Sequence, residues 1–334
     1  MFAYLIKRLV WIPVIVFTVI TIIFLLTHIA PGSAVHIALG PYATGEQIER
    51  LTKQYGLDEP LWVQYGIYIW RLLHGDLGES IVRHKPVSEE ILTFLPASVE
   101  LVFFAMIFIT GVGVTLGVVA ATNKDRFLDI IGRGIAVAGV SMPQFWLGLM
   151  LLLFFSFGLG LLPTTGRIDP AIGTPTRITG MYILDSILTG NWVALKSSIL
   201  HIVLPAFTLG ITSLSTTTRL TRDGVLKVLR EDYIAMARAY GFSERTVNYK
   251  YALRNGIIPA LTNLGMTAAA LFGGAFLVET VFSFPGIGYY ATTSIIHLDY
   301  APCVGVAIVI SLLYILFNLV VDLSYLLIDP RIRF

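Results

Sequence analysis

The run LVWIPVIVFTVITIIFLLTHIA, Leu9 to Ala30, decides the class of fold, because it holds 22 residues without a charged side chain. A helix needs about 20 apolar residues to cross the hydrocarbon core of a bilayer. Lys7 and Arg8 precede the run, which is longer than the apolar core of about 7–15 residues in a cleaved signal peptide. We therefore expect a retained transmembrane anchor.

The composition agrees with a membrane protein. The 334 residues are 56% hydrophobic and only 13% charged, about half the charged fraction of soluble domains. The net charge of +2 is too small to favour a nucleic-acid partner. The single cysteine, Cys303, excludes an internal disulfide and a cysteine-rich metal site, and its apolar surroundings favour a packed thiol.

Five further apolar runs follow the first one, which covers about 9–30. The sequence therefore predicts an all-α integral membrane protein with six transmembrane helices. The connection at 161–180 is rich in Pro, Gly and Thr, so we expect an irregular loop there. The five runs lie at about 97–121, 130–157, 199–218, 259–282 and 301–327.

Six spans place both termini on one side, and the basic residues indicate which side is cytoplasmic. Fifteen of the 23 Lys and Arg residues fall on the face that holds the termini and the segment 219–258. The other eight lie mostly in long segments, which weigh less in the positive-inside rule. Both termini and the segment 219–258 are therefore expected in the cytoplasm.

The segment 31–94 is expected outside, after the first helix. Thr44 and Gln47 have the spacing of a capping box, and Gly56 is a helix stop. A second helix, LWVQYGIYIWRLLHG at 61–75, carries several Trp and Tyr residues. An amphipathic helix at the bilayer surface is the favoured interpretation, since aromatic belts are common there, and a docking surface for a soluble partner is the alternative.

Three carboxylates fall in or near the spans, where charges are costly and often functional. Glu100 and Glu279 lie near the expected outer ends, where water is within reach, so a structural role is at least as well supported as a pathway role. Asp322 is close enough in sequence to pair with Arg331 or Arg333. They do not form the charged relay that a proton-coupled carrier needs.

Motifs for catalysis and nucleotide binding are absent from the sequence. There is no G-x-x-x-x-G-K-[ST], no lysine follows a glycine, and there is no H-E-x-x-H. The six histidines lack metal-ligand spacing. We expect no catalytic site, no metal site, no cofactor in this chain, and no ATPase site of its own. The histidines are His28, His36, His74, His84, His201 and His297.

The polar segment between the fourth and fifth runs predicts a bent pair of helices. TRDGVLKVLREDYIAMARAYG (221–241) predicts a helix that ends at Gly241, where a left-handed turn is easy. SERTVNYKYALRNGIIPA (243–260) predicts a second helix that starts at a Ser243 cap and runs up to Pro259.

Small side chains at Ala235, Ala237 and Ala239 would let another protein's backbone approach, so the bent helix suits a groove on a partner. An amphipathic elbow resting on the membrane is the structural alternative. A DNA-binding helix-turn-helix fits poorly, because residues 219–254 carry a net charge of only +4 between two spans.

This segment resembles the cytoplasmic loop of permease subunits of binding-protein-dependent ABC importers. That loop has an E-A-A triplet, a glycine four residues later and a subsequent I-x-L-P. The triplet corresponds to Ala235-Met236-Ala237 and the glycine to Gly241. The sequence departs from the pattern with Ala235 at the Glu position and Arg254 at the final Pro position, with a proline only at Pro259. Both departures resemble the dipeptide/oligopeptide/nickel branch, where ARAxG and ALRNxxIP are usual.

Six further motifs extend the resemblance over nearly the whole chain, and the chain is most similar to B-type permease subunits of dipeptide transporters. In order they are GDLGES (75–80), LPASVEL (95–101), SMPQFWLG (141–148), LLPTTGR (161–167), ETVFSFPGIG (279–288) and DPRIR (329–333). The segment EDYIAMARAYG (231–241) lies between LLPTTGR and ETVFSFPGIG.

The resemblance implies an ABC type I importer transmembrane fold. Residues 1–94 would form the first helix and the extracytoplasmic segment, and residues 95–328 the permease core. It implies a homologous second permease in a heterodimer, two P-loop ATPase subunits that bind ATP and Mg, and an extracytoplasmic substrate-binding protein, all at a prokaryotic inner membrane. Gly111, Gly113 and Gly117 would let helices slide during alternating access.

The implied substrate is a di- or oligopeptide, with nickel, glutathione or oligosaccharides as alternatives within the branch. A stand-alone ion-coupled carrier or channel is the alternative from another class. The loop 231–259 would couple the permease to the ATPases through Glu231, Asp232, Tyr233, Ala235, Ala237, Arg238, Ala239, Gly241, Phe242, Arg254 and Pro259.

Overall fold

The structure is a computed structural model that describes residues 13–15, 17–22, 24–25, 44–54, 56 and 58–328. Most of the first predicted span, the basic residues at both ends of the chain and the side chain of Asp322 lie outside what is described. The chain divides into two compact units. The first unit contains residues 1–96 and 285–315, and the second contains residues 97–284 and 316–333.

In the first unit, the segment before the second predicted span is helical, as expected. Helix α3 spans Gly45–Gln54 and helix α4 spans Leu61–Leu73. The capping box is confirmed, because the Thr44 N–H donates to Gln47 Oε1 at 3.0 Å and the Gln47 N–H donates to Thr44 Oγ1 at 3.4 Å. Gly56 has a φ of +65°, which agrees with a left-handed helix stop.

Two features of this unit were not predicted. Strands β1 (Glu79–Ser80) and β2 (Lys85–Pro86) form a short hairpin, and helix α15 (Ile287–Ile296) precedes helix α16 (Tyr300–Ile328). Asp299 holds the hairpin, since its carboxylate accepts from the Ser80 hydroxyl at 2.6 Å and from backbone N–H groups of residues 81 and 82. Two-residue strands are too short for an alternating pattern, so this small exception to the all-α expectation depends on a distant aspartate.

The helix that carries the second predicted span begins earlier than expected. It runs without interruption over Val87–Thr122, as α5 (Val87–Phe108), the π-helical turn η1 (Ile109–Gly113) and α6 (Val114–Thr122). The expected span starts near residue 97, directly after Pro96, but Pro96 lies inside the helix. Three buried residues before the proline, Val87, Ile91 and Phe94, pack on α15 and α16 and hold this part helical against the proline penalty of about 3 kcal/mol.

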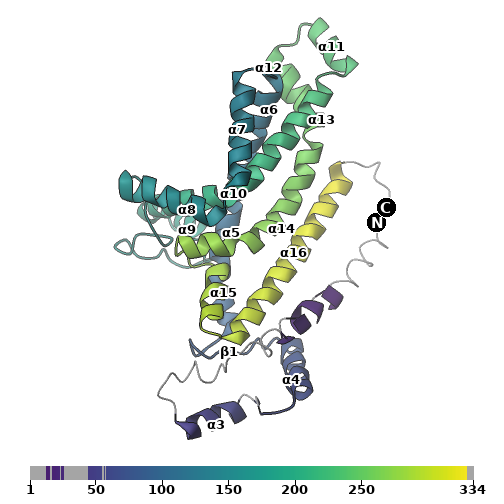
Figure 1. The fold of residues 1–334 in the computed structure, drawn as a ribbon. Coiled ribbons are helices and arrows are strands. Elements are labelled where there is room, and N and C mark those ends of the chain that lie inside the picture. Colours follow the sequence, from purple (N-terminus) through teal and green to yellow (C-terminus); the bar gives the residue numbers. More distant parts are fainter. Residues whose placement is uncertain are drawn as a thin grey trace. The chain divides into compact units, whose positions relative to one another are not determined.

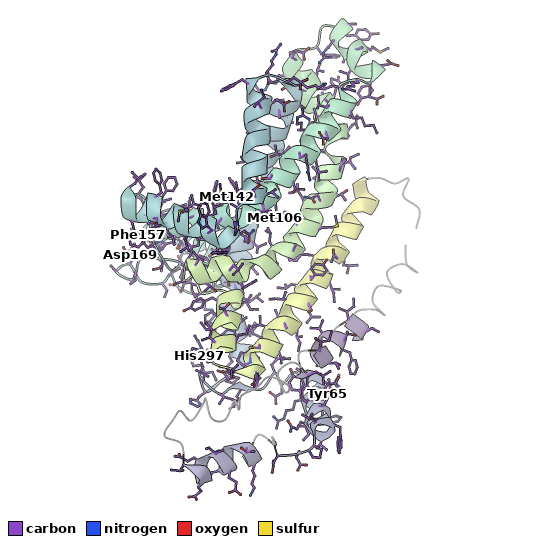
Figure 2. All side chains as sticks on the ribbon, in the orientation of Figure 1. Tyr65, Met106, Met142, Phe157, Asp169 and His297 are labelled. Atoms are coloured by element: carbon purple, nitrogen blue, oxygen red, sulfur yellow. The ribbon has the colours of Figure 1, made fainter. Side chains whose placement is uncertain are left out.

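The prediction of one continuous helix over 130–157 is wrong. Helix α7 spans Phe127–Ser141, and a separate helix follows as α8 (Gln144–Leu151) and the π-helical η2 (Leu152–Gly158). Pro143 causes the break, because it pushes the preceding residue out of the helical region, and Met142 has a ψ of 130°. Beyond Met142, labelled in Figure 2, α8 turns away from the direction of α7, as Figure 1 shows.

Helix α10 (Trp192–Val228) is the longest element, with 37 residues, and extends beyond both ends of the expected span 199–218. Asn191 caps its start by accepting a hydrogen bond from the Ala194 N–H at 3.1 Å. In Figure 1, α10 runs beside α6 and α7 and beside α14 (Ile258–Val281), and it contacts all three. It is therefore the central support of the second unit.

The connection between η2 and α10 is a loop with one short helix, α9 (Tyr182–Leu188), and residues 159–181 are irregular as predicted. A buried ion pair fixes it to α5, since Arg167 Nη2 donates to Glu100 Oε2 at 2.5 Å. The expectation that water reaches Glu100 and Glu279 is wrong, because they are 3% and 0% exposed. Glu279 accepts from the Ser98 hydroxyl at 2.5 Å, so both carboxylates have polar partners inside the unit.

Four helices in the described part of the chain are long and apolar enough to cross a membrane: Val87–Thr122, Trp192–Val228, Ile258–Val281 and Tyr300–Leu319. Two shorter apolar helices, Pro13–Ile22 and Gln144–Gly158, accompany them. The protein is thus a mostly helical, multi-pass membrane protein.

Candidate functional site: the elbow at residues 229–256

The chain between α10 and α14 folds back on itself, and we call residues 229–256 the elbow. Helix α10 ends at Val228, and a short turn leads into α11 (Asp232–Ala239). The prediction of one helix over 221–241 is therefore wrong. The chain turns at 229–231 because Val225 of α10 and Ile234 of α11 belong to the same buried cluster, which a straight helix does not allow.

The turn after α11 has the geometry that the glycine predicts. Gly241 has a φ of +78°, its N–H donates to the Arg238 carbonyl at 2.9 Å, and the Phe242 N–H donates to the Ala237 carbonyl at 3.3 Å. These two bonds form a Schellman motif, which satisfies the last carbonyls of the helix.

The predicted second helix also starts where expected. The Ser243 hydroxyl accepts from the Thr246 N–H at 3.3 Å. From this cap the chain continues through α12 (Glu244–Thr246), the π-helical η3 (Val247–Ala252) and α13 (Leu253–Gly256) to α14.

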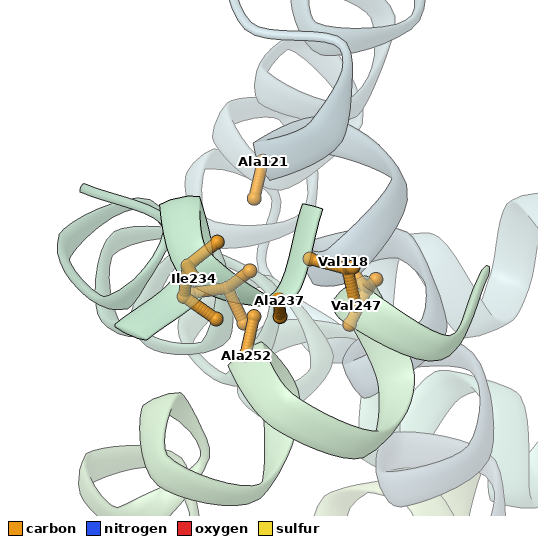
Figure 3. Close-up of a cluster of buried hydrophobic side chains, with 7 residues drawn as sticks. Val118, Ala121, Ile234, Ala237, Val247 and Ala252 are labelled. Atoms are coloured by element: carbon orange, nitrogen blue, oxygen red, sulfur yellow. The ribbon is translucent and has the colours of Figure 1, made fainter. Parts of the chain in front are cut away.

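A small apolar core holds the elbow against the end of the helix bundle. Its seven buried residues come from α6, α10, α11 and η3, and Figure 3 shows six of them labelled as they converge. The core contains three alanines, so the helices approach closely. The elbow is therefore packed against α6 and α10, and its position is held by side-chain contacts as well as by its two chain connections. The seven residues are Val118, Ala121, Val225, Ile234, Ala237, Val247 and Ala252.

The opposite face of the elbow exposes large aromatic and apolar side chains. Tyr240 is 76% exposed and Met236 60%, and Tyr233, Phe242 and Tyr249 are between 41% and 46% exposed. Single exposed apolar residues are common, but five of them on one projecting segment are typical of an interaction surface.

The predicted site residues divide between the two faces. Ala237 lies in the core, Gly241 forms the turn, and Pro259 lies outside the elbow in the first turn of α14. The remaining residues are exposed: Glu231, Asp232, Tyr233, Ala235, Arg238, Ala239, Phe242 and Arg254. Of the three small residues expected to admit a partner, only Ala235 and Ala239 are therefore available to it.

Polar contacts fix the exposed face. The Asn255 amide donates to the Tyr233 hydroxyl at 2.8 Å, and Arg238 Nε lies 2.9 Å from Glu244 Oε1 across the Gly241 turn. The ring of Phe242 contacts that of Tyr251 at 5.6 Å between centroids.

Sequence reasoning missed a crossing of two glycines at the base of the elbow. A Cβ atom on Gly224 would lie 2.0 Å from the Gly256 carbonyl oxygen, and a Cβ on Gly256 would lie 2.7 Å from the Val225 nitrogen. Helices α10 and α13 therefore meet backbone to backbone. A glycine inside each helical run was the available signal.

A buried ion pair beside the elbow was also missed. Asp129 at the start of α7 is 0% exposed and accepts from Arg222 Nε at 2.7 Å and Nη2 at 2.8 Å. The Asp125 N–H donates to the same carboxylate at 3.0 Å. The pair joins the start of α7 to the last turns of α10, and no sequence spacing connects the two residues.

The expected small-residue face of the second span is present in part. A Cβ on Gly117 would lie 2.6 Å from the Thr221 Cβ, and one on Gly113 would lie 3.3 Å from Thr217, so both glycines allow close packing on α10. A Cβ on Gly111 would meet no atom of another helix within 4 Å among the described residues, so Gly111 does not contribute to this close packing.

The described residues contain no group of His, Cys, Asp or Glu side chains suited to a metal ion.

The architecture is that of a multi-pass membrane protein with a packed, aromatic-faced elbow at one end of its helices. Residues 113–334 match the family described as binding-protein-dependent transport system inner membrane component, and residues 1–102 match the N-terminal family of such membrane components. The chain belongs to this family of inner membrane transport proteins.

Curated relatives match over nearly the full length. The probable D,D-dipeptide transport system permease protein of Escherichia coli (strain K12) is 43% identical over 314 residues, which cover 94% of this chain and 92% of the relative. The dipeptide transport system permease protein of Alkalihalophilus pseudofirmus is 42% identical over 339 residues, which cover both chains completely. A glutathione transport system permease protein of Salmonella choleraesuis is 37% identical over 335 residues, again with complete coverage of both chains.

Proposed function

We propose that this chain is the transmembrane permease subunit of an ATP-driven importer of di- and oligopeptides. The carrying observation is the similarity to dipeptide permeases over 92–100% of their length, and the elbow supplies the surface that such a subunit needs. An extracytoplasmic binding protein would deliver the peptide, and two P-loop ATPase subunits with bound ATP and Mg would drive transport. A homologous second permease would complete the pathway as a heterodimer.

The proposal includes six spans with both termini in the cytoplasm. The four long helices and the two shorter apolar ones supply six candidates, and the charge distribution favours a cytoplasmic elbow. Residues 1–94 would form the first span and the extracytoplasmic segment, and residues 95–328 the permease core.

The elbow would couple the ATPases to the spans. Its exposed face, with Tyr233, Met236 and Tyr240, would lie in a groove of an ATPase subunit, as an amphipathic helix does in many complexes. A force on α11 would pass through the elbow core to α6 and α10, because closely packed helices move as units rather than deform.

The first test is a mild-detergent purification of the tagged chain from its native membranes. We expect P-loop ATPases and a second multi-pass permease to copurify, together with ATP hydrolysis stimulated by a peptide-loaded binding protein. A chain recovered alone that transports after reconstitution without ATP would overturn the proposal in favour of a self-sufficient carrier.

The coupling role has its own test at Gly241. A Gly241→Glu variant should insert normally but lose peptide uptake, because it strains the left-handed turn and adds a charge to the contact surface. Gly241→Asn is the matched control, since asparagine tolerates the left-handed conformation, and it should keep most of the uptake. Normal uptake by Gly241→Glu would refute the coupling role.

The glutathione permease relative motivates one alternative substrate. Competition separates the two: unlabelled dipeptide should abolish uptake of labelled dipeptide, and glutathione should not. Complete inhibition by glutathione at an equal concentration would favour the alternative.

A further inference from the structure

A pocket of about 410 Å³ lies between α6, α7 and α10, beside the elbow. This volume falls in the range of small-molecule sites. The walls are mostly apolar, and the polar groups gather along α10. Its lining includes Ser141 at the end of α7, and Ser215, Thr218, Arg219, Arg222 and Asp223 on α10.

Two polar groups at this pocket lack partners among the described residues. The Thr218 side chain is on a residue only 4% exposed, and its hydroxyl has no hydrogen bond. A buried hydroxyl without a partner is costly, and a ligand that bonds to it removes that cost. Arg219 is exposed and forms no ion pair within the described part of the chain, so its guanidinium is available to an anionic group.

The charges around the pocket select the class of ligand. Arg222 is already engaged by Asp129 and lies 3.2 Å from the Asp223 carboxylate. Arg219 and Asp223 are therefore the charged groups of the lining that are available to a ligand. Because Asp129 outside the lining neutralises Arg222, the four charges of Arg219, Arg222, Asp129 and Asp223 sum to zero. A site for anionic lipid headgroups would carry an excess of positive charge, which this pocket lacks.

The spacing of the two groups fits a short zwitterion. Arg219 and Asp223 are four residues apart on one helix face, so their Cα atoms are about 6 Å apart along the axis. An extended dipeptide spans about 7 Å between its ends. An ammonium group near Asp223 and a carboxylate near Arg219 therefore match the two ends of one small peptide.

We propose that this pocket binds a small zwitterionic peptide on the elbow side of the permease, with Arg219 pairing with its carboxylate, Asp223 with its ammonium group, and Thr218 with its backbone. The proposal rests on the proposed function, since it assigns a site within the chain to the transported substrate. Because Val140 and Ser141 lie next to the Pro143 break, a movement of α7 would open or close the pocket.

The test measures binding of radiolabelled L-alanyl-L-alanine to the assembled transporter in phosphatidylcholine nanodiscs, without the binding protein. We expect about tenfold weaker binding for Arg219→Gln, about threefold weaker binding for Thr218→Val, and unchanged binding for Lys227→Gln. Lys227 is the matched control, because it is an exposed cation on the same helix outside the pocket. N-acetyl-alanyl-alanine amide, which lacks both charges, should not compete.

Wild-type affinity in Arg219→Gln and Thr218→Val would overturn the pocket assignment, and so would equal competition by the uncharged analogue. Displacement of the labelled peptide by phosphatidylglycerol would also overturn it, by assigning the pocket to lipid. If the same preparation takes up dipeptide with its binding protein but binds none without it, the pocket fails and the proposed function stands. Failure of uptake with the binding protein present would instead refute the proposed function.

Discussion

The crossing of Gly224 and Gly256 gives the sharpest prediction for the Gly224→Ala variant. The added Cβ would lie 2.0 Å from the Gly256 carbonyl oxygen, whereas ordinary contacts begin near 3.4 Å. The two helices must therefore separate by about 1.4 Å. Because the obstacle is backbone, no side-chain rotation relieves the clash.

The magnitude follows from two opposing terms. Replacing glycine by alanine within a helix gains up to about 1 kcal/mol, and overpacking costs about 1–3 kcal/mol. A backbone collision belongs at the upper end of that range, so we expect a net local loss of about 1–2 kcal/mol at the base of the elbow. Separation here also shifts Val225, which belongs to the elbow core.

The assay combines hydrogen exchange over residues 243–256 with peptide uptake by the assembled transporter. We expect exchange about tenfold faster in Gly224→Ala, from the local loss of about 1.4 kcal/mol or more, and uptake reduced by a similar factor. Gly273→Ala is the control, since a Cβ there has no atom within 4 Å. Wild-type exchange and uptake in Gly224→Ala would refute the role of the crossing.

Three further predictions follow from charged groups. Asp129→Asn should lower the free energy of unfolding by about 3 kcal/mol or more, because the substitution leaves the partly buried Arg222 without its anion. The loss would be measured as a lower midpoint of thermal unfolding, and an unchanged midpoint would contradict the prediction. Arg238→Ala should change stability by less than about 1 kcal/mol, because its bridge to Glu244 is exposed, and a larger loss would show that the bridge is not merely a surface contact. Burial opposes ionisation of Asp185, but hydrogen bonds from the 178–180 segment outweigh this effect and lower the pKa of the carboxyl group. The stability that the Asp185 carboxylate contributes is therefore full above pH 3.8, the usual pKa of aspartate, and is lost as the pH falls further. Asp185→Asn should remove this acid dependence from hydrogen exchange in residues 178–190, and an acid dependence that persists in the variant would contradict the assignment.

Much of the fold was predictable because membranes impose a simple rule. Long apolar runs must be helical to satisfy their backbone in lipid, so α14 and α16 lie at the residues expected from hydropathy. The Thr44 capping box and the Gly241 turn were equally predictable, because the hydrogen bonds that define them form between residues close in sequence.

The errors arose where distant contacts outweigh local preference. The expected span begins directly after Pro96, but packing of Val87 and Ile91 keeps the helix intact before the proline. Pro143 lies within the apolar run that is expected to form one span at about 130–157, yet there the proline does break the helix. The same residue type thus has opposite consequences: buried contacts hold the helix before Pro96, whereas Pro143 is exposed and the helix breaks there.

By itself, the sequence determined the membrane class, the polar segment that interrupts the spans, and the family resemblance, because hydropathy and short motifs are local properties of the chain. The tertiary structure decided which face of the elbow is buried, the backbone contact between Gly224 and Gly256, and the pairing of Asp129 with Arg222 across 93 residues. Those features depend on how helices far apart in sequence are brought into contact, and no periodicity within one helix records its neighbour.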